Sequence, residues 1–203
     1  MSFQAPVVIQ TVNAAFPKAE LSLPHVSGGP SEAADNKINK KIHETVQQLV
    51  NSQGSLDDPR AQMIGYYEQK TNEKDYLSLS LFNYAYTGGA HGLTLQESLT
   101  FKQSTGQTFT LEQLFKPGSD YVKRISAIVS AQIKARAIDT LEPFTAIRPD
   151  QDYYVADRSL VIYFQLYELA AYVYGFLYFP ISVYELQDII NEEGPLGPMT
   201  VND

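Results

Sequence analysis

The sequence contains no cysteine and no tryptophan, and only three histidines. Without cysteine the chain has no disulfide framework, no thiolate nucleophile and no sulfur-bound zinc. His25, His43 and His91 fall on a predicted strand, a predicted helix and a predicted turn, without the short spacing of metal ligands, so no metal site is expected. No Walker loop, dinucleotide fingerprint or nucleophile elbow occurs either, and we expect no cofactor.

Long apolar runs are also lacking. The densest, residues 172–181, is about half the roughly 20 residues that a membrane span requires. The first six residues have no basic start, no apolar core and no small-residue cleavage site, which argues against a secretory signal. These features predict a soluble, cytoplasmic protein, with a trimmed signal segment as the alternative.

Basic residues are fewer than acidic ones: the sequence has 15 Lys and Arg and 23 Asp and Glu, which gives a net charge of −8. This balance disfavours nucleic acid, because phosphate contacts require Lys and Arg, and suits a basic protein partner. With 203 residues, of which 44% are hydrophobic, the chain is long and apolar enough to fold around a core.

The order of strand and helix patterns predicts an α+β fold, in which an antiparallel sheet packs against two or three helices. We expect two lobes in one compact domain. Residues 1–60 would form an N-terminal lobe and residues 61–191 a C-terminal lobe, and residues 192–203, rich in glycine and proline, would form a frayed tail. No internal repeat or long linker is found.

Two segments are the most informative for the first half of the chain. Ser31 is a suitable cap for a helix over residues 31–51, whose apolar stripe is Ile38, Ile42, Val46, Leu49 and Val50. A hairpin over residues 76–103 follows, in which leucines alternate with serines and a parity change after Leu81 predicts a β-bulge. Its turn contains Gly88, Gly89, His91 and Gly92.

In the second half we predict a helix over residues 119–139, capped by Ser119, and strands over 159–164 and 172–181. In the last strand Val173, Leu177, Phe179 and Ile181 would form the core face. The opposite face would carry Tyr172, Tyr174, Phe176 and Tyr178. This row is either an interaction patch or a second buried layer, and the density of predicted helices favours burial.

Several motifs resemble a known bacterial family. They are Tyr84 to Gly92, Thr105-Gly106-Gln107, Thr110 to Phe115, Tyr163 to Ala170 and Gly175. Together they are similar to the family of unknown function that forms the lysozyme-binding ectodomain of the anti-sigma-V factor. Residues 17–50 resemble the companion domain found at the N-terminus of a peptidoglycan deacetylase. The resemblance covers roughly residues 7–190.

This resemblance implies a module that is usually extracytoplasmic and that binds a protein or a cell-wall component, without catalysis of its own. The expected partner is a basic, lysozyme-like protein or a wall glycan, and the oligomeric state is open. The candidate binding residues are Gly88, Gly89, His91 and Gly92 of the turn with Tyr172, Tyr174 and Tyr178 of the last strand.

Two other hypotheses remain open. In the first, the protein is a hydrolase of cell-wall glycan that uses Glu97 and His91 as its acid and base. For His91 a structural role in closing the turn is favoured, and for Glu97, on a leucine face, an ion pair is favoured over catalysis. In the second, the protein is structural and assembles through the edge of its sheet.

Overall fold

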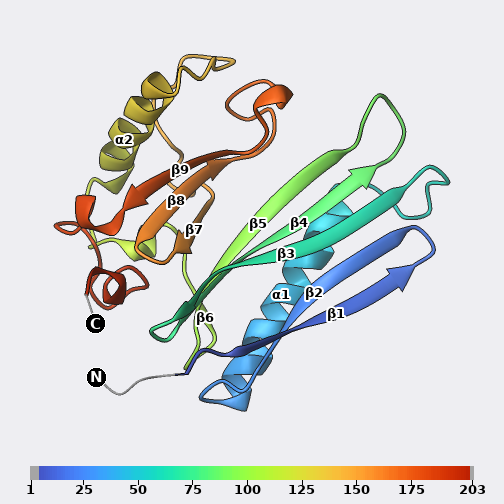
Figure 1. Cartoon of the computed structure of the whole chain (residues 1–203), viewed down its shortest axis with the longest axis horizontal. Helices are drawn as coiled ribbons and strands as arrows, with labels where there is room; N and C mark the ends of the chain where they lie inside the picture. The colour runs from blue at the N-terminus through green and yellow to red at the C-terminus, as the bar shows by residue number, and fades with distance from the viewer. Residues whose placement is uncertain (1–4, 202–203) are drawn as a thin grey trace. The chain divides into compact units, whose positions relative to one another are not determined.

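The computed structural model describes residues 5–201 and divides the chain into two units, residues 1–108 and residues 109–203 (Figure 1). Strands, mostly antiparallel, and two α-helices make up an α+β fold, as predicted. The division falls after Thr108 rather than after residue 60, because β3 pairs with β2, and the hairpin of β4 and β5 pairs in turn with β3.

The first unit is a six-stranded sheet in the order β1-β2-β3-β4-β5-β6, with one helix across one of its faces (Figure 1). All neighbours are antiparallel except β2 and β3, which run parallel because α1 carries the chain back between them. The elements are β1 (Val8–Phe16), β2 (Ala19–Ser27), α1 (Glu32–Ser52), β3 (Gln62–Glu73), β4 (Tyr76–Tyr86), β5 (Leu93–Lys102) and β6 (Gln107–Thr108).

Helix α1 forms where its cap and apolar stripe predict it. The side chain of Ser31 accepts a hydrogen bond from the Ala34 amide, which satisfies one free donor of the first turn. The stripe then packs on β4 and its neighbours, and each large side chain that it buries contributes about 1.5–3 kcal/mol. The buried core includes Ile38, Ile42, Val46, Leu49, Leu77, Leu79, Leu81 and Phe101.

Strand β4 is buried on both faces rather than on one. Besides the leucines, Ser78 and Ser80 are fully buried, and their hydroxyls lie 3.0 Å and 2.8 Å from those of Thr100 and Ser98 on β5. The register between β4 and β5 is unbroken, so the predicted bulge after Leu81 is wrong; the irregularity lies in β3, between Gln69 and Thr71. Phe82 and Tyr84 lie on the same face of β4 as Ser78 and Ser80.

The second unit contains a three-stranded antiparallel sheet in the order β7-β8-β9 and the helix α2. Its elements are η1 (Glu112–Leu114), α2 (Tyr121–Ala135), β7 (Tyr153–Ala156), β8 (Ser159–Phe164), η2 (Tyr172–Tyr174), β9 (Leu177–Ser182), η3 (Val183–Glu185) and η4 (Pro198–Thr200). Buried side chains of α2 and the sheet include Ile125, Val129, Leu160, Ile162, Phe179 and Ile181. The predicted cap of α2 is wrong, because Asp120 occupies the cap position and the buried Ser119 hydroxyl has no hydrogen-bond partner.

The C-terminal segment packs instead of fraying. Leu196 and Met199 are fully buried, and a short helical turn, η4, forms around Met199. The glycines and prolines of this segment predicted a tail with little to bury. Instead, the side chains of Leu196 and Met199 are buried and hold the segment against the rest of its unit. The prediction of a frayed tail is therefore wrong up to Val201, and residues 202–203 lie outside the described residues.

Candidate functional site

The tyrosines predicted to lie on the last strand are divided between two structures. Tyr172 and Tyr174 belong to the short helix η2, and β9 begins only at Leu177. Gly175, at φ 66°, ends the helical turn in a conformation that favours glycine and breaks the expected strand. The predicted row of rings on one strand face is therefore wrong, although the core positions Leu177, Phe179 and Ile181 are buried as predicted.

Five apolar or aromatic side chains are exposed on η2 and on the loops beside it, and we call them the tyrosine patch. They are Leu141, Tyr167, Tyr172, Val173 and Tyr174, with exposed fractions of 55%, 49%, 37%, 86% and 39%. Val173, which the strand pattern places on the core face, is instead the most exposed of the five. Burial of the whole row, which the sequence favoured, does not occur. Large apolar side chains gathered on a surface are typical of interaction sites.

Tyr178 lies apart from this patch, in a ring cluster on the sheet. Its ring centroid is 6.0 Å from that of Tyr154 and 6.1 Å from that of Tyr163, at angles typical of aromatic packing. The side chain is half-buried, and Tyr163 beneath it is buried. Tyr178 therefore supports the sheet, and only Tyr172 and Tyr174 of the three predicted tyrosines are presented on the loop.

A tight turn presents Tyr167. The Glu168 amide donates to the Gln165 carbonyl at 3.0 Å, and the Glu168 carboxylate accepts from the Gln165 amide at 2.7 Å. This closes the turn on both sides and leaves Tyr167 at φ 68°, a conformation that favours glycine. A tyrosine held there costs on the order of 1 kcal/mol. Sequence reasoning missed Tyr167 as a site residue, although the flanking Gln165 and Glu168 were a usable signal for the turn.

A network of charged side chains lies beneath this turn. Arg148 donates to the Glu168 carboxylate, which also accepts from Nε2 of the Gln151 side chain at 3.3 Å. Asp152 accepts from the Gln165 side chain at 3.1 Å and lies 4.0 Å from Arg148. Burial raises the pKa of Asp152, against the lowering effect of the hydrogen bond from Gln165. The network stabilises the base of the turn on which Tyr167 stands.

The other side of the patch is tied to the chain that follows α2. Thr140 and Ala170 form an isolated β-bridge, and the Leu141 amide donates to the Leu169 carbonyl at 3.0 Å. The Tyr174 hydroxyl accepts from the Asp139 amide at 3.2 Å. Tyr167 and Tyr172 pack with ring centroids 5.3 Å apart. The patch is thus a cross-linked surface, which lowers the entropy that would be lost when it binds a partner.

The glycine turn joins β4 and β5 in the first unit. Gly88 and Gly89 have φ values of 98° and 116°, which require glycine, and the Tyr86 hydroxyl donates to the Gly89 carbonyl at 3.1 Å. At Gly92 an added Cβ would overlap the end of the Tyr84 ring, so any larger residue there would displace that side chain. These glycines therefore have a shaping role, as expected, while their part in binding remains a prediction.

His91 and Glu97 belong to the same hairpin but are not neighbours. His91 is exposed, and its Nδ1 lies 2.8 Å from the Gly92 carbonyl oxygen. Glu97 is exposed on β5, opposite Leu81, beyond the short stretch where β6 covers that strand. The rise from Leu93 to Glu97 alone is about 13 Å, so the pair is not arranged as an acid and base around one bond.

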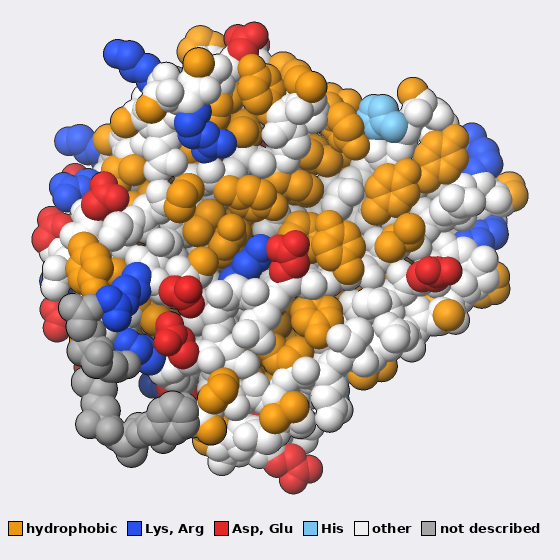
Figure 2. Space-filling model, viewed as in Figure 1, with side chains coloured by type: hydrophobic (Ala, Val, Ile, Leu, Met, Phe, Trp, Pro, Cys, Tyr) orange, Lys and Arg blue, Asp and Glu red, His pale blue; other side chains and the backbone are white. Residues whose placement is uncertain are grey.

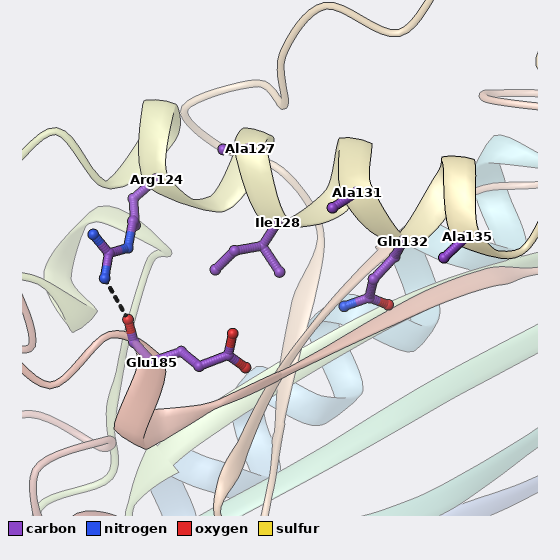
Figure 3. Close-up of a pocket in the computed structure, with 7 residues that line it drawn as sticks. All are labelled: Arg124, Ala127, Ile128, Ala131, Gln132, Ala135 and Glu185. Carbon is purple, nitrogen blue, oxygen red and sulfur yellow. Dashed lines mark hydrogen bonds between the residues drawn. The ribbon is translucent and has the colours of Figure 1, made fainter.

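A shallow hollow lies beside α2 (Figure 3). Its floor is apolar, with Ile128 between Ala127 and Ala131 and with Ala135 further along the helix. The polar groups at its ends are already engaged: Arg124 donates to the Glu185 carbonyl at 3.0 Å, and Gln132 donates to the Pro180 carbonyl at 2.8 Å. This arrangement supplies no acid–base pair.

Parts of the surface are apolar, and the metal-binding side chains of the described residues are scattered rather than grouped. Figure 2 shows broad hydrophobic areas on one face, with few charged side chains among them. Within residues 5–201 no three His, Asp or Glu side chains are grouped to hold a metal ion. In the same residues no helix is both long and apolar enough to cross a membrane.

Two family models match the chain, one in each half. Residues 11–94 match the family described as deacetylase PdaC, and residues 112–184 match the family described as a protein of unknown function, DUF3298. The glycine turn lies in the first match. The second contains the whole tyrosine patch and the network beneath Tyr167.

Two curated proteins of Bacillus subtilis are similar in sequence. The anti-sigma-V factor RsiV is 28% identical over 187 residues, which cover 84% of this chain and 65% of the relative. The peptidoglycan-N-acetylmuramic acid deacetylase PdaC is 23% identical over 180 residues, which cover 80% of this chain and 37% of the relative. The chain thus spans about two thirds of one relative and little more than a third of the other.

Solved structures show the same fold. A DUF3298 family member from Bacteroides fragilis has a TM-score of 0.74 at 11% identity and covers 98% of this chain and 99% of its own. Another from Pseudomonas aeruginosa has a TM-score of 0.72 at 12% identity and covers 93% and 96%. The resemblance stated from the sequence is confirmed: a region similar to the PdaC family is followed by a region similar to the DUF3298 family, and the chain is similar in sequence to the anti-sigma-V factor RsiV and to the deacetylase PdaC.

Proposed function

We propose that the protein is a binding module and that its tyrosine patch recognises a basic protein of the lysozyme type. The observation that carries this proposal is the patch itself, in which exposed rings and aliphatic side chains are held in place by a bonded framework. Tyrosine offers a large contact area with little side-chain entropy to lose, which suits protein recognition.

Charge supports a basic partner. Asp139 and Glu142, both exposed, adjoin the patch on the chain that follows α2, and the whole chain carries a net charge of −8. Acidic groups around an apolar centre attract a cationic protein and orient it on approach. The similarity to an anti-sigma factor agrees with such a receptor-like role, and a wall glycan is the alternative ligand.

The test is calorimetric titration of the protein with lysozyme. Tyr167→Gly is the most informative variant, because it removes a ring of the patch and also places glycine at a φ of 68°, where glycine is preferred. We expect a melting temperature equal to or above that of the wild type and binding at least about tenfold weaker, the effect of losing a well-placed aromatic contact.

Tyr184→Ala is the matched control. Tyr184 is 45% exposed in the same unit, but it lies on η3, which follows β9, whereas the patch precedes that strand. Its removal should leave the affinity unchanged. Wild-type protein that gives no heat with lysozyme, or that loses affinity equally in both variants, would refute the proposal. Saturable binding of soluble wall glycan without any lysozyme binding would favour the alternative ligand.

A further inference from the structure

Strand β1 is the outer strand of the six-stranded sheet and hydrogen-bonds along one side to β2 (Figure 1). Seven of its nine residues are exposed. Its sequence, VIQTVNAAF, contains no charged residue, no proline and no glycine. Its register with β2 is continuous from Val8 to Phe16, without a bulge. The far side of β1 therefore offers a long and regular edge for pairing.

The opposite end of the sheet is organised differently. There the outer strand β6 has only two residues, paired with Phe101 and Lys102, and the uncovered part of β5 carries the exposed carboxylate Glu97. Short outer strands and charged side chains are devices by which proteins prevent edge-to-edge pairing. Strand β1 has neither, so pairing is opposed at one edge of this sheet and open at the other.

The exposed apolar residues of β1 are spaced symmetrically. Val8, Val12 and Phe16 are 51%, 50% and 54% exposed and lie four residues apart. Because side chains alternate along a strand and the register is unbroken, all three project from one face of the β1–β2 ribbon. An antiparallel second copy centred on Val12 would place valine against valine in the middle, with Val8 against Phe16 on either side. The strand is thus complementary to itself.

We propose that β1 is a self-association edge, through which two copies of the chain pair antiparallel about Val12 and continue one sheet into the other. The uncharged strand brings no like charges together in this register, and three apolar cross-strand pairs form on one face. Pairing of nine-residue strands buries less area than a stable dimer usually does, so the dimer is weak and concentration-dependent.

Analytical ultracentrifugation of the full chain tests this register. The wild type should shift from monomer toward dimer as its concentration rises into the upper micromolar range. Val12→Lys and Val12→Glu, each alone, should weaken the dimer about tenfold or more, because each puts two like charges opposite each other. An equimolar mixture of the two variants should restore association, because lysine then faces glutamate.

Asn13→Lys is the control. Asn13 is an exposed neighbour on the same strand, but its side chain projects from the other ribbon face and opposes Thr11 of the second copy. It should weaken the dimer less than Val12→Lys does. Matching melting temperatures would show that the variants fold. A wild type that stays monomeric throughout, or a mixture that associates no better than its parts, overturns the proposal, whatever the lysozyme titration gives.

Discussion

At the residue scale, Tyr167 and Asp152 both occupy environments that their residue types ordinarily avoid. Tyr167 has a backbone conformation that favours glycine, and Asp152 is a partly buried carboxyl group with a raised pKa. Both lie in the framework of the same turn, joined through Gln165. Such unfavourable environments cluster at functional sites, which agrees with our proposal that the tyrosine patch binds a partner.

Asp152 makes the stability of this framework depend on pH. Because burial raises its pKa above the usual value of 3.8, the folded chain holds the proton more tightly than the unfolded chain. Its favourable contribution to the unfolding free energy is therefore complete below the usual aspartate pKa and is lost as the pH rises through the raised value. Glu168, Asp150 and Arg148 also act on this carboxyl group and set how far the pKa moves.

Asp152→Asn should remove this dependence, since the amide stays neutral and its oxygen can still accept from Gln165. We expect the variant to gain stability relative to the wild type as the pH rises above the usual aspartate pKa of 3.8, measured as the difference in urea midpoints at each pH. A difference that does not change with pH, or that moves in favour of the wild type as the pH rises, would contradict the assignment.

At the scale of elements, the periodicity of apolar residues correctly predicted those helices and strands whose limits depend on local sequence. It failed where contacts with distant residues set the limits. The stripe of α1 and the leucines of β4 are buried as their spacing predicted. The strand expected over 172–181 begins late because Gly175 ends a helical turn, and that turn depends on contacts with the distant Asp139. The parity change after Leu81 reflects a strand buried on both faces, a tertiary feature that no single-strand pattern reveals.

The C-terminal segment is a further element for which the prediction from composition, a frayed tail, was wrong. Leu196→Ala should cost about 2–5 kcal/mol of unfolding free energy, because the side chain is fully buried and its removal leaves a cavity. Val201→Ala, at a residue that is 40% exposed, should change the free energy by less than about 0.5 kcal/mol. Urea unfolding measures both, and equal small effects would mean that the segment is not docked in solution.

At the scale of the whole molecule, the net charge of −8 acts oppositely on the two proposed associations. Binding of a basic protein joins opposite charges, so added salt should weaken it. Self-association joins two molecules of like charge, so the same salt should strengthen it. Titration with lysozyme and sedimentation of the protein alone, each at low and moderate salt, should give slopes of opposite sign. Slopes of the same sign would mean that charge does not control one of the two contacts.

The parallel junction between β2 and β3 has a consequence for how the first unit forms. Only Ala19, Leu21 and the residue between them pair with β3, and the 34 residues 28–61 separate the two strands. By contrast, β3, β4 and β5 follow one another through short connections. Contacts between neighbours in the chain close with less loss of entropy than distant ones. We therefore expect the β3–β5 meander to form early in folding, and the β1–β2 hairpin to join it after α1 has brought the ends together.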